Sequence, residues 1–184
     1  MSDIKNYEEV VKIAGKHLGK VGGDGYSDQY SPELLVKIPR YLNREAYGIN
    51  DANLPFVGVD TWNAYEVSAI TTKGQPVAGM LKIVCPADSS HHVESKSIKL
   101  YLNSFNMTRI GNTAKDCVKG IEARVKRDLD EVLETNNTVT FYQSEEDATA
   151  LTFTYKDLSE FTDLDAIDFT AFKSDSSQLE AEEG

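Results

Sequence analysis

The sequence predicts an α+β domain in which four antiparallel strands carry a pair of helices on one face. Neighbouring segments that alternate apolar and polar residues indicate strands. Segments with an apolar residue every three or four positions indicate helices. The six segments, in chain order, are strands at 64–72 and 77–85, helices at 94–105 and 113–134, and strands at 138–143 and 151–155. Strand-strand-helix-helix-strand-strand is the order expected of a two-layer α+β arrangement.

The size and charge of the chain describe a globular domain with an acidic tail. Its 184 residues are 40% hydrophobic and 27% charged, which is enough apolar material for a buried core. The net charge of −11 is uneven, because residues 157–184 hold nine acids and a single lysine. A near-neutral body with an acidic tail argues against a general nucleic-acid binder. The tail is expected to be either a solvated extension or a partner-facing segment.

Three absences bear on location. The sequence has no run of eighteen apolar residues and no secretory signal near its start, so no membrane association is expected. Its two cysteines, Cys85 and Cys117, form no disulfide framework and lack metal-ligand spacing. We therefore expect a cytoplasmic protein without a metal site, in which both cysteines are small core residues.

The first 53 residues hold few regular elements. Residues 1–25 are predicted to be an extension, weakly helical until a glycine-rich loop ends the pattern. From Tyr26 to Asn53 two X-Pro pairs discourage long helices, so a turn-rich segment is expected. It contains Arg40 and Arg44, which either hold a phosphate or carboxylate or lie solvated at the surface.

The two central strands are predicted to form a hairpin. Tyr65, Val67 and Ala69 alternate with polar neighbours and are expected on one face of the first strand. The turn at 73–76 contains a glycine, and the return strand follows it directly. A polar loop at 86–92 is expected to lead into the first helix.

The segment from Glu94 to Phe105 is the most informative stretch. Its apolar residues share one helical face, and Ser95 or Ser97 is expected to cap its first turn. Glu94 then lies beside the positive end of the helix, with Lys96 nearby. A carboxylate there suits a ligand with several donors, or one that also carries phosphate. The alternative is an ordinary amphipathic helix with a charged edge.

Residue patterns alone give no function. The sequence has no phosphate-binding loop, no Gly-x-Gly-x-x-Gly and no His-Glu-x-x-His. His91 and His92 are adjacent and are expected to point apart, which disfavours joint metal ligation. These patterns predict an α+β domain and no specific activity.

A family resemblance goes further. The segment from Glu94 to Phe105 closely resembles the signature of the NADPH-dependent 7-cyano-7-deazaguanine reductases (QueF), nitrile reductases of the queuosine pathway. Other segments resemble the N-terminal module of the two-module members: Ile38–Arg44, Leu54–Phe56, Gly58–Trp62, Asn103–Asn106 and Thr108–Arg109. The resemblance covers about 26–156, and residues 157–184 look like the linker between modules. It implies a tunnelling fold, whose modules associate side by side and bind purine-like ligands at their interfaces.

The resemblance also implies roles for four residues. Glu94 would accept N–H bonds from the guanine-like edge of the substrate, as a carboxylate does from two adjacent donors. Val93 would help to line that pocket. Ser95 and Lys96 would lie where the family contacts NADPH.

The chain departs from the family where the chemistry occurs. The family's reaction needs a cysteine nucleophile and an aspartate that handles the proton. The corresponding positions here are Ile70 and Val77, so the resemblance implies no catalytic residue in this chain.

Three interpretations remain open. The chain is half of a composite reductase site, in a homo-oligomer or with a separate catalytic QueF module. Alternatively, it binds a purine-like molecule without catalysis, or it is a structural assembly protein built on the fold.

Overall fold

The computed structural model describes residues 8, 11, 12, 15, 27, 29–144 and 158–168. The chain divides into two units, residues 1–150 and 151–184. The described elements of the first unit are η1 (Pro32–Leu34), β1 (Lys37–Pro39), α2 (Tyr41–Arg44), η2 (Glu45–Tyr47), β2 (Val59–Ile70), β3 (Pro76–Pro86), β4 (His91–Val93), α3 (Ser95–Asn103), α4 (Ala114–Leu133) and β5 (Thr138–Tyr142). The second unit contributes two short helices, η3 (Leu158–Glu160) and η4 (Leu164–Ala166).

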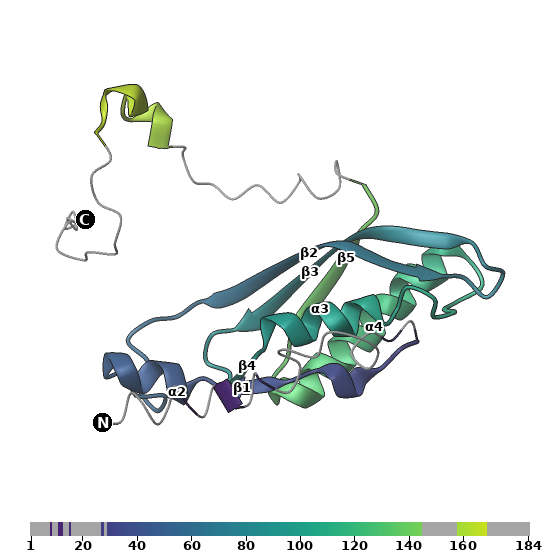
Figure 1. The fold of residues 1–184 in the computed structure, drawn as a ribbon, viewed down its shortest axis with the longest axis horizontal. Coiled ribbons are helices and arrows are strands. Elements are labelled where there is room, and N and C mark those ends of the chain that lie inside the picture. The colour runs from purple at the N-terminus through teal and green to yellow at the C-terminus, as the bar shows by residue number, and fades with distance from the viewer. Residues whose placement is uncertain are drawn as a thin grey trace. The chain divides into compact units, whose positions relative to one another are not determined.

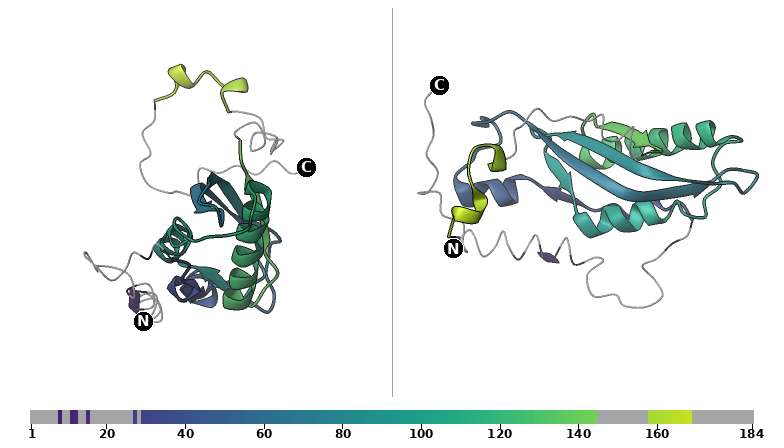
Figure 2. Two further views of the ribbon diagram at one scale, coloured as in Figure 1. Left: turned by 90° about the vertical axis from the view of Figure 1, so that its right-hand side faces the viewer. Right: turned by 90° about the horizontal axis from the view of Figure 1, so that it is seen from above.

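The first unit is a two-layer α+β arrangement. Strands β2, β3 and β5 form an antiparallel sheet in the order β2-β3-β5. Helices α3 and α4 lie side by side on one face of this sheet (Figures 1 and 2). The predicted hairpin, both long helices and the strand after them are confirmed. The predicted strand at 151–155 lies outside the described residues, and so does most of the predicted extension at 1–25.

The core lies between the sheet and the two helices. The expected stripe on α4 is buried, with Ile121, Val125 and Leu129 all at 0% exposure. Tyr101 and Phe105, on the predicted face of the first long helix, are equally buried. Cys85 and Cys117 are buried as well, as predicted, and burial raises the pKa of the Cys117 thiol.

A β-bulge makes one prediction about the hairpin wrong. The pairing runs from Ala64 opposite Leu81 to Val67 opposite Gly79, so three steps on β2 match two on β3. The side chains before and after the irregularity therefore alternate out of phase. Tyr65 was expected on the same face as Val67, but Tyr65 is 73% exposed whereas Val67 is buried. Gly79, which pairs with Val67 directly after the bulge, is a position where a Cβ would come within 2.2 Å of the carbonyl oxygen of Tyr142.

A second, two-stranded ladder corrects the prediction of a loop before α3. Strand β4 pairs antiparallel with β1, placing Val93 opposite Lys37. The pairing continues beyond the ladder, because the backbone N–H of Glu94 donates to the carbonyl of Val36 at 2.8 Å. The segment predicted to be turn-rich thus supplies the strand that fixes the entry into α3.

A polar network anchors the other end of α3. Tyr30 and Tyr101 each donate a hydrogen bond of 2.6 Å to the same oxygen of buried Asp128. The rings of Tyr30, Tyr101 and Phe105 pack edge to face. Burial and the hydrogen bond to Asp128 raise the pKa of Tyr30 to about 12, and the same causes raise the pKa of Tyr101.

No helix in the described part of the chain is long and apolar enough to cross a membrane. The cytoplasmic location expected from the sequence stays a prediction.

Candidate functional site

Glu94 caps α3 with its own side chain. Its backbone is extended, and its carboxylate accepts from the N–H of Lys96 at 2.9 Å and from the N–H of Ser97 at 2.7 Å. The capping residue is therefore Glu94, not Ser95 or Ser97 as expected. Two of the donors that a helix start leaves without a partner are satisfied in this way.

The surroundings of Glu94 fix its position from several sides. The residue is 8% exposed. Ser97 Oγ donates to the Glu94 carbonyl at 2.8 Å and accepts from the N–H of Val36 at 3.1 Å. Ser95 Oγ makes a longer hydrogen bond of 3.3 Å to Glu94 Oε1. The carboxylate is thus a preorganised acceptor that retains little spare capacity, because an ionised carboxylate has about four lone-pair positions.

The other three predicted binding residues follow the local geometry. Val93 is 3% exposed and packs in the hydrophobic core, which leaves little of its side chain for contact with a ligand. Ser95 is exposed and Lys96 half-buried in the first turn of α3. The structure therefore brings Glu94, Ser95 and Lys96 together at one helix end, and it keeps Val93 mainly behind them.

The hairpin positions that would carry the family's chemistry hold aliphatic side chains in a well-ordered turn. Val77 is buried opposite Ala69 on the core face, and half-buried Ile70 pairs with Pro76. The turn between them is closed by a 2.8 Å hydrogen bond from the N–H of Thr71 to the carbonyl of Gln75. Neither Ile70 nor Val77 carries a group that forms a bond to a nitrile or transfers a proton.

The predicted binding residues and the hairpin positions Ile70 and Val77 lie at opposite ends of α3. Glu94 precedes the helix, whereas Ile70 bonds through its backbone to Thr108 and Ile110, in the connection that follows it. Nine residues of α-helix span about 14 Å. Figure 1 shows β4 at the start of α3 and the β2–β3 turn beyond its far end. The length of α3 therefore separates Glu94 from the hairpin positions Ile70 and Val77.

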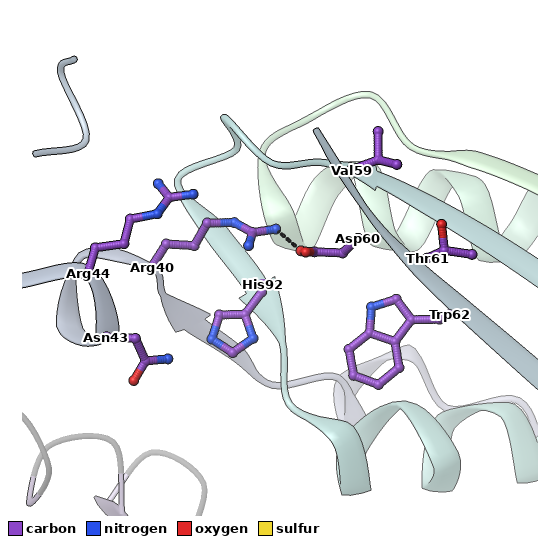
Figure 3. Close-up of a pocket in the computed structure, with 8 residues that line it drawn as sticks. All are labelled: Arg40, Asn43, Arg44, Val59, Asp60, Thr61, Trp62 and His92. Carbon is purple, nitrogen blue, oxygen red and sulfur yellow. Dashed lines mark hydrogen bonds and ion pairs between the residues drawn. The ribbon is translucent and has the colours of Figure 1, made fainter. Parts of the chain in front are cut away.

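A separate pocket of about 590 Å³ lies beside the start of β2 (Figure 3). Its lining residues are Arg40, Asn43, Arg44, Val59, Asp60, Thr61, Trp62 and His92. Sequence reasoning singled out Arg40 and Arg44, whose spacing of four residues was the available signal. It missed Trp62 and His92, which β2 and β4 bring together from distant parts of the chain.

The described residues contain no group of three or more histidine, cysteine or acidic side chains arranged to hold a metal ion. His91 and His92 lie on β4, and burial is the main cause that lowers the pKa of each. Both imidazoles are therefore neutral near pH 7.

Comparisons with known proteins identify the family of this chain. The family described as "Nitrile reductase, 7-cyano-7-deazaguanine-reductase N-term" matches residues 26–141. Relatives named NADPH-dependent 7-cyano-7-deazaguanine reductase include one from Dechloromonas aromatica, 51% identical over 56% of this chain and 35% of its own length. One from Rickettsia akari is 50% identical over 58% of this chain and 37% of its own. One from Colwellia psychrerythraea is 37% identical over 74% of this chain and 46% of its own. The chain thus spans less than half the length of these relatives.

Proposed function

The chain belongs to the family of nitrile reductase N-terminal domains, and from this premise we propose that it recognises a 7-deazaguanine through Glu94. In this proposal it supplies one half of an NADPH-dependent nitrile reductase site, and a second module supplies the nucleophile and the proton donor. The observation that carries the proposal is the buried, fixed carboxylate of Glu94 at the start of α3, with aliphatic residues at the hairpin.

Recognition by Glu94 follows from carboxylate geometry. A guanine-like edge offers adjacent N–H donors, which match the two oxygens of a carboxylate in a bidentate arrangement. Lys96 N and Ser97 N hold the two oxygens in place, so the acceptor is ordered before a ligand arrives. The hydroxyl of exposed Ser95 makes the longest of the three contacts, so it is the group that would turn away to admit the substrate.

Ser95 and Lys96 carry the types of side chain that bind a phosphate-bearing cofactor. They offer a hydroxyl and an ammonium group in the first turn of α3, where the helix dipole favours negative charge. The backbone N–H of Lys96 is already bound to Glu94, so contacts to NADPH would come from the two side chains. NADPH would supply the two hydrides, one from each of two cofactor molecules, that reduce the nitrile to an aminomethyl group.

We also propose that the domain is a tunnelling-fold module that assembles with further modules, either copies of this chain or a catalytic QueF module. Strand β2 is an edge of the described sheet, and apolar residues on and next to it are exposed: Val57 at 100%, Val59 at 59% and Tyr65 at 73%. An exposed strand edge with apolar side chains is a ready surface for pairing with another chain.

Calorimetry of the purified chain with 7-cyano-7-deazaguanine, with and without NADPH, tests the proposal. We expect saturable binding, together with no NADPH oxidation by the chain alone. Glu94→Ala should abolish binding, whereas Glu131→Ala, on the exposed face of α4, should leave it unchanged. Unchanged binding in Glu94→Ala would sink the site assignment.

Two alternative functions correspond to other outcomes. Binding that persists without turnover in the presence of a catalytic QueF module would favour a purine-binding protein that has no reductase role. Absence of any binding would favour a structural protein that uses the fold for assembly. NADPH oxidation by the chain alone would contradict the composite site, and Cys85 would be the first residue to test as an unrecognised nucleophile.

A further inference from the structure

The pocket beside β2 concentrates two arginines that are almost entirely removed from solvent. The side chains of Arg40 and Arg44 are only 11% and 10% exposed. They lie four residues apart, at the start and end of the short helix α2, and both line the same pocket. Two like charges at this spacing repel each other, so their burial needs compensating negative charge.

Two carboxylates supply part of that compensation. Arg40 forms an ion pair with Asp60, and Arg44 forms one with Asp51 at 2.7 Å. Asp60 and Asp51 are far more exposed than the arginines, at 40% and 37%. Asp51 does not line the pocket, so the pocket itself has two cationic residues against one anionic residue. Each arginine thus has one carboxylate partner, and of these two partners only Asp60 lines the pocket.

Neutral partners hold both guanidinium groups in place. Arg40 Nε donates to Ser89 Oγ at 3.1 Å, and Arg44 Nη2 donates to the carbonyl of Ala87. The guanidinium of Arg44 also lies 5.7 Å from the centre of the Phe56 ring. Within the described part of the chain, these contacts leave Arg40 Nη1 and Arg44 Nε without an acceptor. The two groups are fixed but retain donors for a ligand.

Other pocket residues offer further donors. The side chains of Asn43, Thr61 and Trp62 have no hydrogen-bond partner among the described residues. His92 Nε2 is buried and has no partner either, in a ring that is neutral near pH 7. A buried polar atom without a partner destabilises the folded chain, so a bound ligand is one physical reason to keep it. Figure 3 shows Arg40, Asp60, His92 and Trp62 grouped around this space.

We propose that this pocket binds a phosphate group, in a site distinct from the Glu94 carboxylate, which is not among its lining residues. Guanidinium groups match phosphate oxygens with paired N–H donors, and fixed arginines lose little freedom on binding. The phosphate comes either as the free ion or as part of a nucleotide, whose base would find the indole of Trp62 at the same pocket. The proposal does not depend on recognition of a deazaguanine.

Trp62 is the chain's single tryptophan, so its fluorescence reports on this pocket without interference from other tryptophans. We would titrate the full chain with inorganic phosphate and, separately, with 2′,5′-ADP, and follow Trp62 emission alongside calorimetry. The expected result is saturable binding of phosphate. Binding of 2′,5′-ADP at least about tenfold tighter would identify a nucleotide as the source, and equal affinities would identify the free ion.

Asn43→Asp is the decisive variant, because it is isosteric, its residue is exposed, and it adds a negative charge to the pocket. The added negative charge would repel a bound phosphate, so we expect binding of both probes to weaken by roughly tenfold. Arg44→Lys keeps the charge but loses the paired donors and should also weaken binding. Arg124→Gln, on α4 and outside the pocket, is the matched control and should bind as the unmodified chain does.

Three outcomes would overturn the proposal. The first is that the unmodified chain shows no saturable binding of either probe. The second is that the Asn43→Asp variant binds the probes as tightly as the unmodified chain. The third is that Arg124→Gln and Arg44→Lys lose the same amount of affinity. The first would mean that the arginines only serve the structure. The second and third would place the phosphate elsewhere on the molecule.

Discussion

The two ends of α3 differ in the kind of interaction that holds them. At the start of the helix, Glu94 accepts two backbone N–H groups and is the only carboxylate in the predicted site. Beyond its far end, the β2–β3 turn is flanked by aliphatic Ile70 and Val77. The start of the helix thus presents a hydrogen-bond acceptor, whereas the hairpin beyond its far end presents aliphatic side chains that pack. Within one domain, the fold thus separates the carboxylate that we propose binds a ligand from the positions where the family's chemistry would take place.

The largest loss of stability is expected when a charge is introduced at the β2–β3 hairpin. Val77→Asp would place a carboxylate on the core face, where the side chain is 3% exposed. We expect the free energy of unfolding to fall by about 4 kcal/mol, because the charge has no partner there. Urea denaturation measures this change.

Ala78→Asp is the matched control for that substitution. Ala78 is the next residue on β3, but it is exposed on the opposite face of the sheet. Its substitution should change stability by no more than about 0.5 kcal/mol. Equal losses in the two variants would mean that the hairpin end is not a packed core, and the contrast between the two ends of α3 would fail.

The next effect concerns the tyrosines near the end of α3. Tyr30→Phe removes the 2.6 Å hydrogen bond to Asp128 and should lower stability by about 1–2 kcal/mol near pH 7. The pKa of Tyr30 is raised to about 12 in the folded chain, above the ordinary value of 10. The stabilisation is therefore fully present below about pH 10 and is lost as the pH rises toward 12.

The dependence of stability on pH is measured by comparing the urea midpoints of the unmodified chain and Tyr30→Phe between pH 8 and pH 12. This interval covers the pH range in which tyrosines ionise. The unmodified chain should lose stability faster with rising pH. Tyr101 keeps its own contact with Asp128 in the variant, so part of the alkaline loss should remain. Parallel pH profiles would contradict a role for ionisation of Tyr30.

Sequence periodicity predicted the parts of the fold that depend on local pattern. The stripes of α3 and α4 were visible because each helix buries one continuous face. The bulge at Tyr65 was not, since alternation alone cannot show where a strand gains one unpaired residue. The β1–β4 ladder was also missed, because three-residue strands give too short a pattern to separate from a loop.

The candidate site was predicted through resemblance more than through pattern. Glu94 was placed correctly beside the start of α3, but its role as the cap was assigned to the serines, which are commoner caps than glutamate. The pocket residues Trp62 and His92 are thirty positions apart, and only the arrangement of β2 and β4 brings them together. No local signal in the sequence identifies such a pair.

Capping and recognition by Glu94 can be separated experimentally. Glu94→Ala removes the cap and should lower stability by about 1 kcal/mol. Glu94→Asp should retain most of that stability, because aspartate is a preferred N-cap, but it draws the carboxylate back by one methylene. Binding of 7-cyano-7-deazaguanine should therefore be lost in both variants, while urea denaturation detects a loss only in Glu94→Ala. If Glu94→Asp binds normally, the position of the carboxylate does not set recognition.

The smallest change in stability is expected for a substitution at Ser95. Here the test is whether the affinity for each ligand rises or falls. Its hydroxyl is exposed and makes a 3.3 Å contact to Glu94, so Ser95→Ala should alter stability by less than about 0.5 kcal/mol. Removing this donor leaves one more lone pair of Glu94 open, and binding of the deazaguanine should stay the same or tighten slightly. NADPH should bind more weakly, since the variant lacks a hydroxyl in the first turn of α3. Calorimetry with each ligand separates the two effects, and parallel weakening of both would mean that Ser95 serves to hold Glu94 in place and does not contact the cofactor.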